Sequence, residues 1–171
     1  MKLNREALMT YLDAGMHTTW ASVTNESPVN WEIIGDDIEE MSVEMNSETE
    51  QHKNILGQTR TDDKGYSPTM DADPFYADPE KALYTVLRDI AMERKKGDQC
   101  KTLMMEVIVE DTEATTHAAY VREVILKPTS YGGDTTYVNI PFNVSEDGGW
   151  VKGTVTAASL RTGNPVFTAT P

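Results

Sequence analysis

One segment of the chain has the apolar spacing of a helix, while apolar residues in most other segments alternate as they do in strands. Within residues 79–96, four apolar side chains share one helical face: Leu83, Val86, Leu87 and Ile90. Asp78 is suited to cap the first turn, and Gly97 is suited to end the last one. We therefore expect a helix over residues 79–96 whose apolar face is buried against strands.

Period-two alternation predicts strands in much of the remaining chain. Residues 135–145 alternate most regularly, with an apolar and a polar face, and residues 40–46 do so over a shorter length. Residues 101–111 and 118–128 are nearly continuous apolar runs, as is typical of central strands. Six or seven such strands against one helix predict a mainly β fold with one flanking α-helix, a β-sandwich or barrel in which the helix is a plug or side wall.

Four other segments carry no strong period. Residues 3–13 are predicted as a short helix or arm, and residues 47–65 as a long loop that serves as a contact element, since loops beyond about 12 to 15 residues are usually functional or disordered. The Asp-Gly-Gly sequence at residues 147–149 predicts a hairpin turn. Residues 160–171 are predicted as a tail whose order depends on a neighbour.

Composition limits the classes of protein that this chain resembles. A length of 171 residues suits one domain. The 28 acidic and 15 basic residues give a net charge of −13, which repels phosphate and disfavours ordinary binding of nucleic acid. Cys100, the single cysteine, cannot form an internal disulfide and is expected to be buried and inert. No apolar run approaches the length that crosses a membrane.

Motifs for catalysis or metal binding are not found. His17, His52 and His117 lie in polar segments without metal-ligand spacing and are expected on the surface. Asp71 and Asp73 share a strand face, but no third ligand accompanies them. There is no nucleophile elbow and no phosphate-binding glycine loop. We expect no enzymatic activity, no cofactor and no metal.

Three stretches of sequence carry a resemblance to a known family. They are W-x-x-I-G-D-D-I-E-E at residues 31–40, N-I-L-G at residues 54–57, and D-x-x-P-x-x-A-x-x-E-K-A-L-Y at residues 71–84. In this order, and followed by a run of strands to Ser159, they resemble the tail tube (major tail) proteins of long-tailed bacteriophages. The resemblance implies a single tail tube domain over residues 1–171, a β-sandwich or barrel that forms hexameric rings stacked into a hollow tube.

The resemblance also implies roles for particular segments. Residues 1–30 become an N-terminal arm, residues 47–65 a ring-stacking loop and residues 160–171 a contact-making tail. Lumen-lining candidates are Glu40, Ser42, Glu44, Thr69, Asp71, Asn139 and Asn143. Ring-stacking candidates are Glu50, Lys53, Ile55, Leu56 and Arg60.

Partners and location follow from the same resemblance. The chain is expected to bind copies of itself, a tape measure protein, and tail terminator or baseplate proteins, while DNA passes through the lumen without specific binding. It is expected to be made in the host cytoplasm and to end in the virion tail, with no membrane association.

Two alternatives remain open from the sequence. Tubes of contractile tails and of secretion systems resemble the same family, so the kind of machine is not decided. A small β-barrel that binds apolar ligands is the second reading, and it requires a calyx lined by large apolar side chains.

Overall fold

Seventeen elements follow one another in the computed structural model, which describes residues 1–171. The strands are β1 (Leu8–Asp13), β2 (Trp31–Ile34), β3 (Val43–Glu44), β4 (Ser47–Lys53), β5 (Thr59–Tyr66), β6 (Thr69–Ala72), β7 (Lys101–Ile108), β8 (Thr116–Pro128), β9 (Gly132–Gly133), β10 (Val138–Asn139), β11 (Phe142–Thr156) and β12 (Phe167–Ala169). The helices are α1 (Ala82–Met92) and α2 (Ala157–Arg161), with 3-10 turns at Arg5–Ala7, Trp20–Ser22 and Gly97–Cys100.

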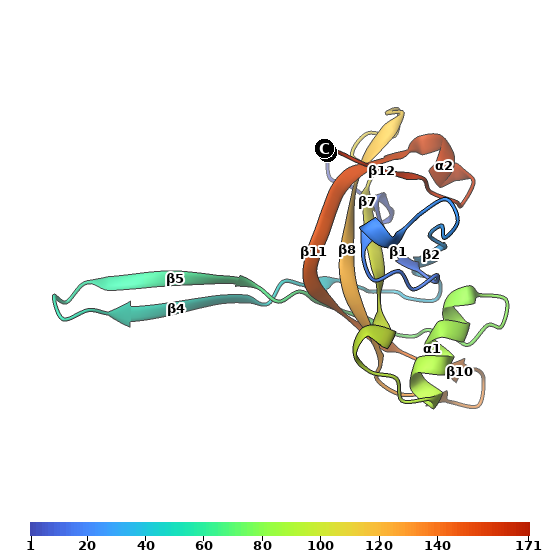
Figure 1. Ribbon diagram of the computed structural model, residues 1–171, viewed down its shortest axis with the longest axis horizontal. Helices are drawn as coiled ribbons and strands as arrows, with labels where there is room; N and C mark the ends of the chain where they lie inside the picture. The colour runs from blue at the N-terminus through green and yellow to red at the C-terminus, as the bar shows by residue number, and fades with distance from the viewer.

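Eight strands form one curled sheet with the shape of a half-barrel (Figure 1). Its order is β2-β1-β7-β8-β11-β6-β3, all neighbours are antiparallel, and β12 adds to β11 beside one end. β9 pairs only with β10, and β4 pairs only with β5. The predicted mainly β class is confirmed, but the chain has two helices where one was expected.

The central strands bury opposite faces in their two halves. In β8, Ala119 and Val121 are buried in the first half, whereas Val124 and Leu126 are buried in the second half. The pairing of β7 with β8 continues through this change without a register shift, so the sheet itself is covered on one face at each end. This arrangement explains why both runs are apolar on nearly every residue.

Each covered face has its own core. The core under α1 contains Leu83, Leu87, Ile90, Met104, Val124, Leu126, Phe142 and Val144 among its 16 buried residues. The core at the other end contains Tyr11, Trp31, Leu103, Met105, Val121, Val155 and Phe167, with Trp20 and Val23 packed against it. Cys100 is fully buried, as expected.

Helix α1 is shorter than predicted, at Ala82–Met92 instead of 79–96. Its first turn is capped from a strand, because the carboxylate of Glu32 accepts a hydrogen bond from Leu83 N at 2.7 Å. Asp78 instead accepts from Glu80 N at 3.0 Å, in the turn before the helix. At the other end, Arg94 adopts a left-handed backbone with φ 52°, which stops the helix before Gly97.

Both ends of the chain belong to the sheet, which corrects the predictions of an arm and of a neighbour-dependent tail. Residues 8–13 form β1, which pairs with β2 on one side and β7 on the other. At the other end, β12 pairs with β11, and Phe167 meets Trp20 edge-on with ring centroids 4.9 Å apart. These strands are short, and a short apolar run does not distinguish a strand from a helical turn.

The predicted hairpin turn at residues 147–149 is also wrong. β11 runs through this segment as one strand and keeps β8 as its partner, with a register shift between Glu146 and Trp150. Gly148 has φ 90°, and the carboxylate of Glu123 occupies the space where Gly149 would carry a Cβ. Asp-Gly-Gly therefore forms a bulge, for which glycine is favoured as it is in turns.

The predicted strand over residues 135–145 is interrupted. β10 covers only Val138–Asn139, and β11 begins after Pro141 at Phe142. Ile140, Phe142 and Val144 are buried, as the alternation predicts, whereas Val138 is 55% exposed. Proline lacks the N–H that a continuous ladder requires, so the strand divides at that residue.

Candidate assembly interface

A long hairpin of β4 and β5 projects from the body of the molecule (Figure 1). Its pairs run from Ser47 with Tyr66 at the root to Lys53 with Thr59 near the tip. Every residue of β4 is exposed, and in β5 only Gly65 is less than exposed. The segment predicted as an unstructured loop is therefore an ordered two-stranded ribbon with no core of its own.

Local polar contacts hold this ribbon. Lys64 lies 3.3 Å from Glu50 and His52 lies 3.5 Å from Asp62 across the strands. At the tip, Asn54 Oδ1 accepts hydrogen bonds from the N–H groups of residues 56 and 58, both at 3.0 Å. Because both faces are polar, the strands carry no alternation of apolar residues, and the sequence period could not reveal them.

All five ring-stacking candidates lie on the hairpin. Ile55 and Leu56 stand at its tip with side chains 102% and 77% exposed, which places two large apolar groups in water. Glu50 and Lys53 lie on β4, and Arg60 lies on β5 opposite His52. The hairpin thus presents an apolar tip on a charged stalk.

Four of the lumen candidates form one polar face at the root of the hairpin. Register places Glu44 beside Thr69, and Asp71 beside Asn143, on the same side of the sheet. Asn143 Nδ2 donates to Asp71 Oδ1 at 2.8 Å. This polar face, Glu44, Thr69, Asp71 and Asn143, is bordered by Lys127, which pairs with Asn143 in register.

The other three lumen candidates lie apart from these pairs. Glu40 and Ser42 are exposed in the segment that precedes β3. Asn139 is half-buried in β10, where its Oδ1 accepts from Phe75 N at 2.9 Å and its Nδ2 donates to Asp73 at 3.3 Å. Its amide therefore fixes the chain before α1 and is not part of the polar face.

An arginine network that the sequence did not reveal lines a groove on the opposite face of the sheet. Arg122 Nε lies 3.6 Å from carboxylate oxygens of both Glu106 and Glu146. The guanidinium also lies over the rings of Tyr120 and Trp150, at 5.7 and 5.8 Å. The sequence indicates this network only through the charged pair in Val-Arg-Glu-Val, residues 121–124, inside an otherwise apolar run.

Burial raises the pKa of Glu146 above its ordinary value, although the nearby Arg122 opposes that shift. The groove has a volume of about 420 Å³, and its lining includes Arg5, Met41 and Met70 besides the three charged residues. Met41 and Met70 also belong to the core under α1, so this charged groove opens at the border of that core.

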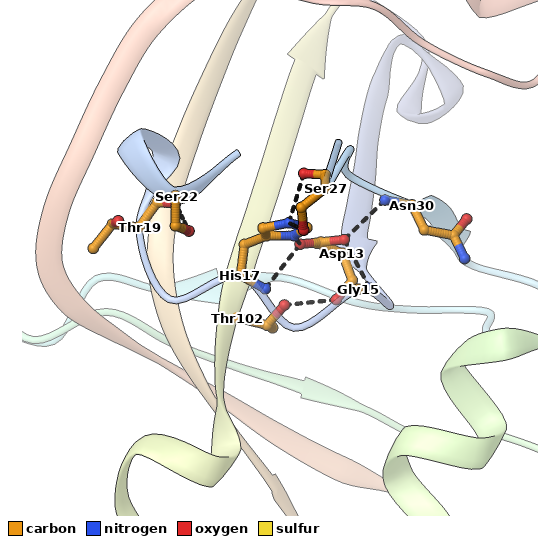
Figure 2. A network of polar contacts seen from close by, with 8 residues as sticks. All are labelled: Asp13, Gly15, His17, Thr19, Ser22, Ser27, Asn30 and Thr102. Atoms are coloured by element: carbon orange, nitrogen blue, oxygen red, sulfur yellow. Dashed lines mark hydrogen bonds and ion pairs between the residues drawn. The ribbon is translucent and has the colours of Figure 1, made fainter. Parts of the chain in front are cut away.

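His17 and His117 are buried, which corrects the prediction of surface histidines. His17 belongs to a polar network in the segment after β1 (Figure 2). Its Nδ1 lies 2.6 Å from Asp13 Oδ2, and its Nε2 lies 2.9 Å from the carbonyl and 3.0 Å from the hydroxyl of Ser27. Only His52 is exposed, on the hairpin.

Ser27, His17 and Asp13 lie at hydrogen-bond distances that would suit a nucleophile, a base and an orienting acid, in that order. Their hydrogen bonds fit another role. A carbonyl oxygen only accepts, so the contact with Ser27 O favours a proton on His17 Nε2. A base with a proton there cannot accept one from the Ser27 hydroxyl. Asp13 is fully buried and also accepts from the N–H groups of Gly15, His17 and Asn30. The network therefore anchors residues 14–30 to β1.

Neither similarity to known proteins nor a metal-binding arrangement assigns a function to these surfaces. No protein-family model and no curated protein matches the chain. No three His, Cys, Asp or Glu side chains come together in an arrangement that could hold a metal ion. Neither helix has the length and apolar character to span a membrane.

Proposed function

We propose that the chain is a structural protein of the tail tube (major tail) type, which assembles as stacked hexameric rings and conducts DNA through an acidic lumen. In this proposal β4 and β5 join successive rings, and the polar face at their root lines the channel. The finished assembly is the virion tail.

The hairpin is the observation that carries the proposal. A two-stranded ribbon with no buried side chain is marginal in water by itself. Here it also holds Ile55 and Leu56 largely exposed to solvent at its far end. Both features are explained if a neighbouring copy covers the ribbon in an assembly.

The charge of the chain supports a channel rather than a binding site for DNA. A net charge of −13 repels phosphate, and the polar face contributes Glu44 and Asp71. Around a ring axis these carboxylates repeat in every subunit. A wall of that kind does not release counterions from a duplex, so the duplex slides past without being held.

Reversal of the lumen charge tests the proposal. Replacing Glu40, Glu44 and Asp71 with lysine changes three charges from −1 to +1, which is +6 per subunit. Purified tubes of this variant should retain DNA at physiological salt, and wild-type tubes should not. A matched variant with lysine at Glu26, Glu110 and Glu113, none of them buried, should behave as wild type. Intact variant tubes that retain no DNA contradict the assigned lumen.

A labelling experiment tests the same assignment without reversing charge. Cys100 is fully buried, so a cysteine introduced as Asp71→Cys is the one reactive thiol. In assembled tubes it should react with a small maleimide but not with a large polymer-linked maleimide. Equal reaction with both reagents places Asp71 on the outside and rejects the assignment.

A further inference from the structure

A cationic pocket lies at the C-terminal end of α1, in a chain that is otherwise acidic. Its lining includes Arg94, Lys95, Lys96 and Lys127 together with the hydroxyl-bearing Ser130 and Tyr131, and it contains no carboxylate. Its volume is about 360 Å³. Four of the 15 basic residues of the chain are therefore gathered around one hollow.

Internal contacts order this pocket but leave most of its charge unpaired. The guanidinium of Arg94 lies 5.5 Å from the ring centroid of Tyr131 and donates to its hydroxyl at 3.1 Å. Lys127 Nζ donates to the carbonyl of Lys95 at 3.2 Å. The one ion pair is Lys95 with Glu93, at 3.3 Å. Arg94, Lys96 and Lys127 have no carboxylate partner within the chain.

The opposite end of α1 carries the opposite charge. An acidic patch is formed by Asp36, Asp37 and Glu39 after β2 together with Asp78 and Glu80 before α1. Asp78 is half-buried, and the other four are exposed. The two parts of the patch meet around Lys81, whose Nζ lies 3.0 Å from Asp36 Oδ2. With 11 residues, α1 separates the patch from the cationic pocket by about 16 Å.

We propose that the cationic pocket of one copy binds the acidic patch of a neighbouring copy, so that the two ends of α1 form a head-to-tail contact that closes a ring. The two surfaces are complementary in charge but differ from each other. A contact between different surfaces is heterologous, and repeated heterologous contacts give a ring when the rotation closes. The inference rests on the proposed function in that it needs an assembly of copies.

The position of α1 separates this contact from the stacking contact. α1 lies on the side of the body opposite the projecting hairpin (Figure 1). A contact through the ends of α1 therefore leaves β4 and β5 free. Contacts within a ring and contacts between rings can then be disrupted independently.

Two charge-reversed forms of the full chain test the contact. In the first, Lys95→Glu, Lys96→Glu and Lys127→Glu change the formal charge of the pocket from +4 to −2, so that both ends of α1 are acidic. In the second, Asp36→Lys, Glu39→Lys and Glu80→Lys change that of the patch, Lys81 included, from −4 to +2, so that both ends are basic. None of these side chains is buried. Each form alone should need an at least about tenfold higher protein concentration than wild type for half-maximal ring formation, measured by sedimentation velocity. Circular dichroism confirms that each form is folded.

An equimolar mixture of the two forms is the decisive sample. Acidic ends then meet basic ends at every contact if the forms alternate, so ring formation should return to the wild-type concentration. Rings of mixed subunits should contain equal numbers of both forms by native mass spectrometry. Rings from either form alone at the wild-type concentration, or no recovery in the mixture, overturn the inference.

Wild-type protein serves as the control that distinguishes a failed contact from a failed assembly. Wild-type protein that forms rings while the mixture fails rejects the contact but leaves the proposed tube function standing. Wild-type protein that forms no assembly at all rejects the proposed function. Retention of a DNA duplex by wild-type monomer, lost in the first charge-reversed form, assigns the pocket to nucleic acid and also overturns the inference.

Discussion

At the scale of single residues, Asp13 organises more of the chain than its place at the end of β1 suggests. Its carboxylate accepts three backbone N–H bonds and contacts His17 Nδ1 at 2.6 Å, while its own carbonyl accepts from Thr102 Oγ1 at 2.6 Å. Thr102 lies on β7, so the network joins the segment of residues 14–30 to the central sheet. A carboxyl group this deeply buried is stable only while these partners remain.

We predict that His17→Ala lowers the free energy of unfolding by about 3 kcal/mol, because it leaves the buried Asp13 without its main partner. Ser27→Ala should cost less than about 1 kcal/mol, since the carbonyl of residue 27 still accepts from His17. Urea denaturation of the three proteins measures both differences. Equal losses in the two variants contradict the anchoring role.

Glu146 gives a prediction for the pH dependence of stability. Burial raises its pKa in the folded state above 4.5, the ordinary value. As pH rises above 4.5, the carboxyl ionises first in the unfolded chain, so the free energy of unfolding falls until the folded-state pKa is passed. Glu146→Gln should remove this fall. Its stability should therefore decline less than that of wild type across the interval that begins at pH 4.5.

Urea titrations at a series of pH values test the Glu146 prediction. Glu113→Gln is the matched control, because Glu113 is exposed in the turn between β7 and β8. The control should reproduce the wild-type pH profile. A Glu146→Gln profile identical to both shows that the carboxyl is not the cause of the decline.

At the scale of elements, the central strands could be predicted and the peripheral ones could not. Residues 101–111 and 118–128 are apolar because one face is buried at each end of the sheet, and this pattern is visible in the sequence. β1 is only six residues long, and β4 and β5 have no buried face, so neither carries a readable period. Their strand character depends on pairing with a partner, which a single sequence does not display.

The residues of the candidate interface could likewise be predicted only in part. Alternation put Glu44, Thr69, Asp71 and Asn143 on polar strand faces, but only the register of β3, β6 and β11 brings them together. Asn139 alternates equally well and lies elsewhere, because Pro141 divides its strand from β11. The Arg122 network and the cationic pocket each join side chains from segments far apart in the sequence.

Shortening the hairpin tests its role as an element. Replacing residues 47–66 with a short Gly-Ser turn removes no residue of either core and shortens the loop that must close. The variant should therefore keep the wild-type thermal stability and still form rings, but rings should not stack into tubes. Sedimentation separates single rings from tubes. Tubes of normal length from this variant show that the hairpin is dispensable.

A smaller change refines the hairpin prediction. Ile55→Ser together with Leu56→Ser leaves the ribbon and its charges intact but removes the apolar tip. Burying two such side chains contributes about 1.5 to 3 kcal/mol each. The variant should therefore stack at clearly higher concentrations than wild type. Unchanged stacking assigns the contact to the stalk and not to the tip.

At the scale of the whole molecule, the exposed surfaces that have no partner within the chain differ in chemistry and point in different directions. The hairpin extends along the long axis, the polar face lies at its root, and the oppositely charged ends of α1 lie on the other side of the body. A monomer has no evident use for an uncovered ribbon and two complementary charged surfaces. A repeating assembly covers them all, with the acidic balance of the chain directed toward a channel.

Electron microscopy of purified wild-type protein at rising concentration tests the central claim most directly. The account predicts rings that stack into hollow tubes with a regular axial repeat, and more tubes as concentration rises. Particles that remain single 19.0 kDa chains at every concentration and at moderate salt contradict it.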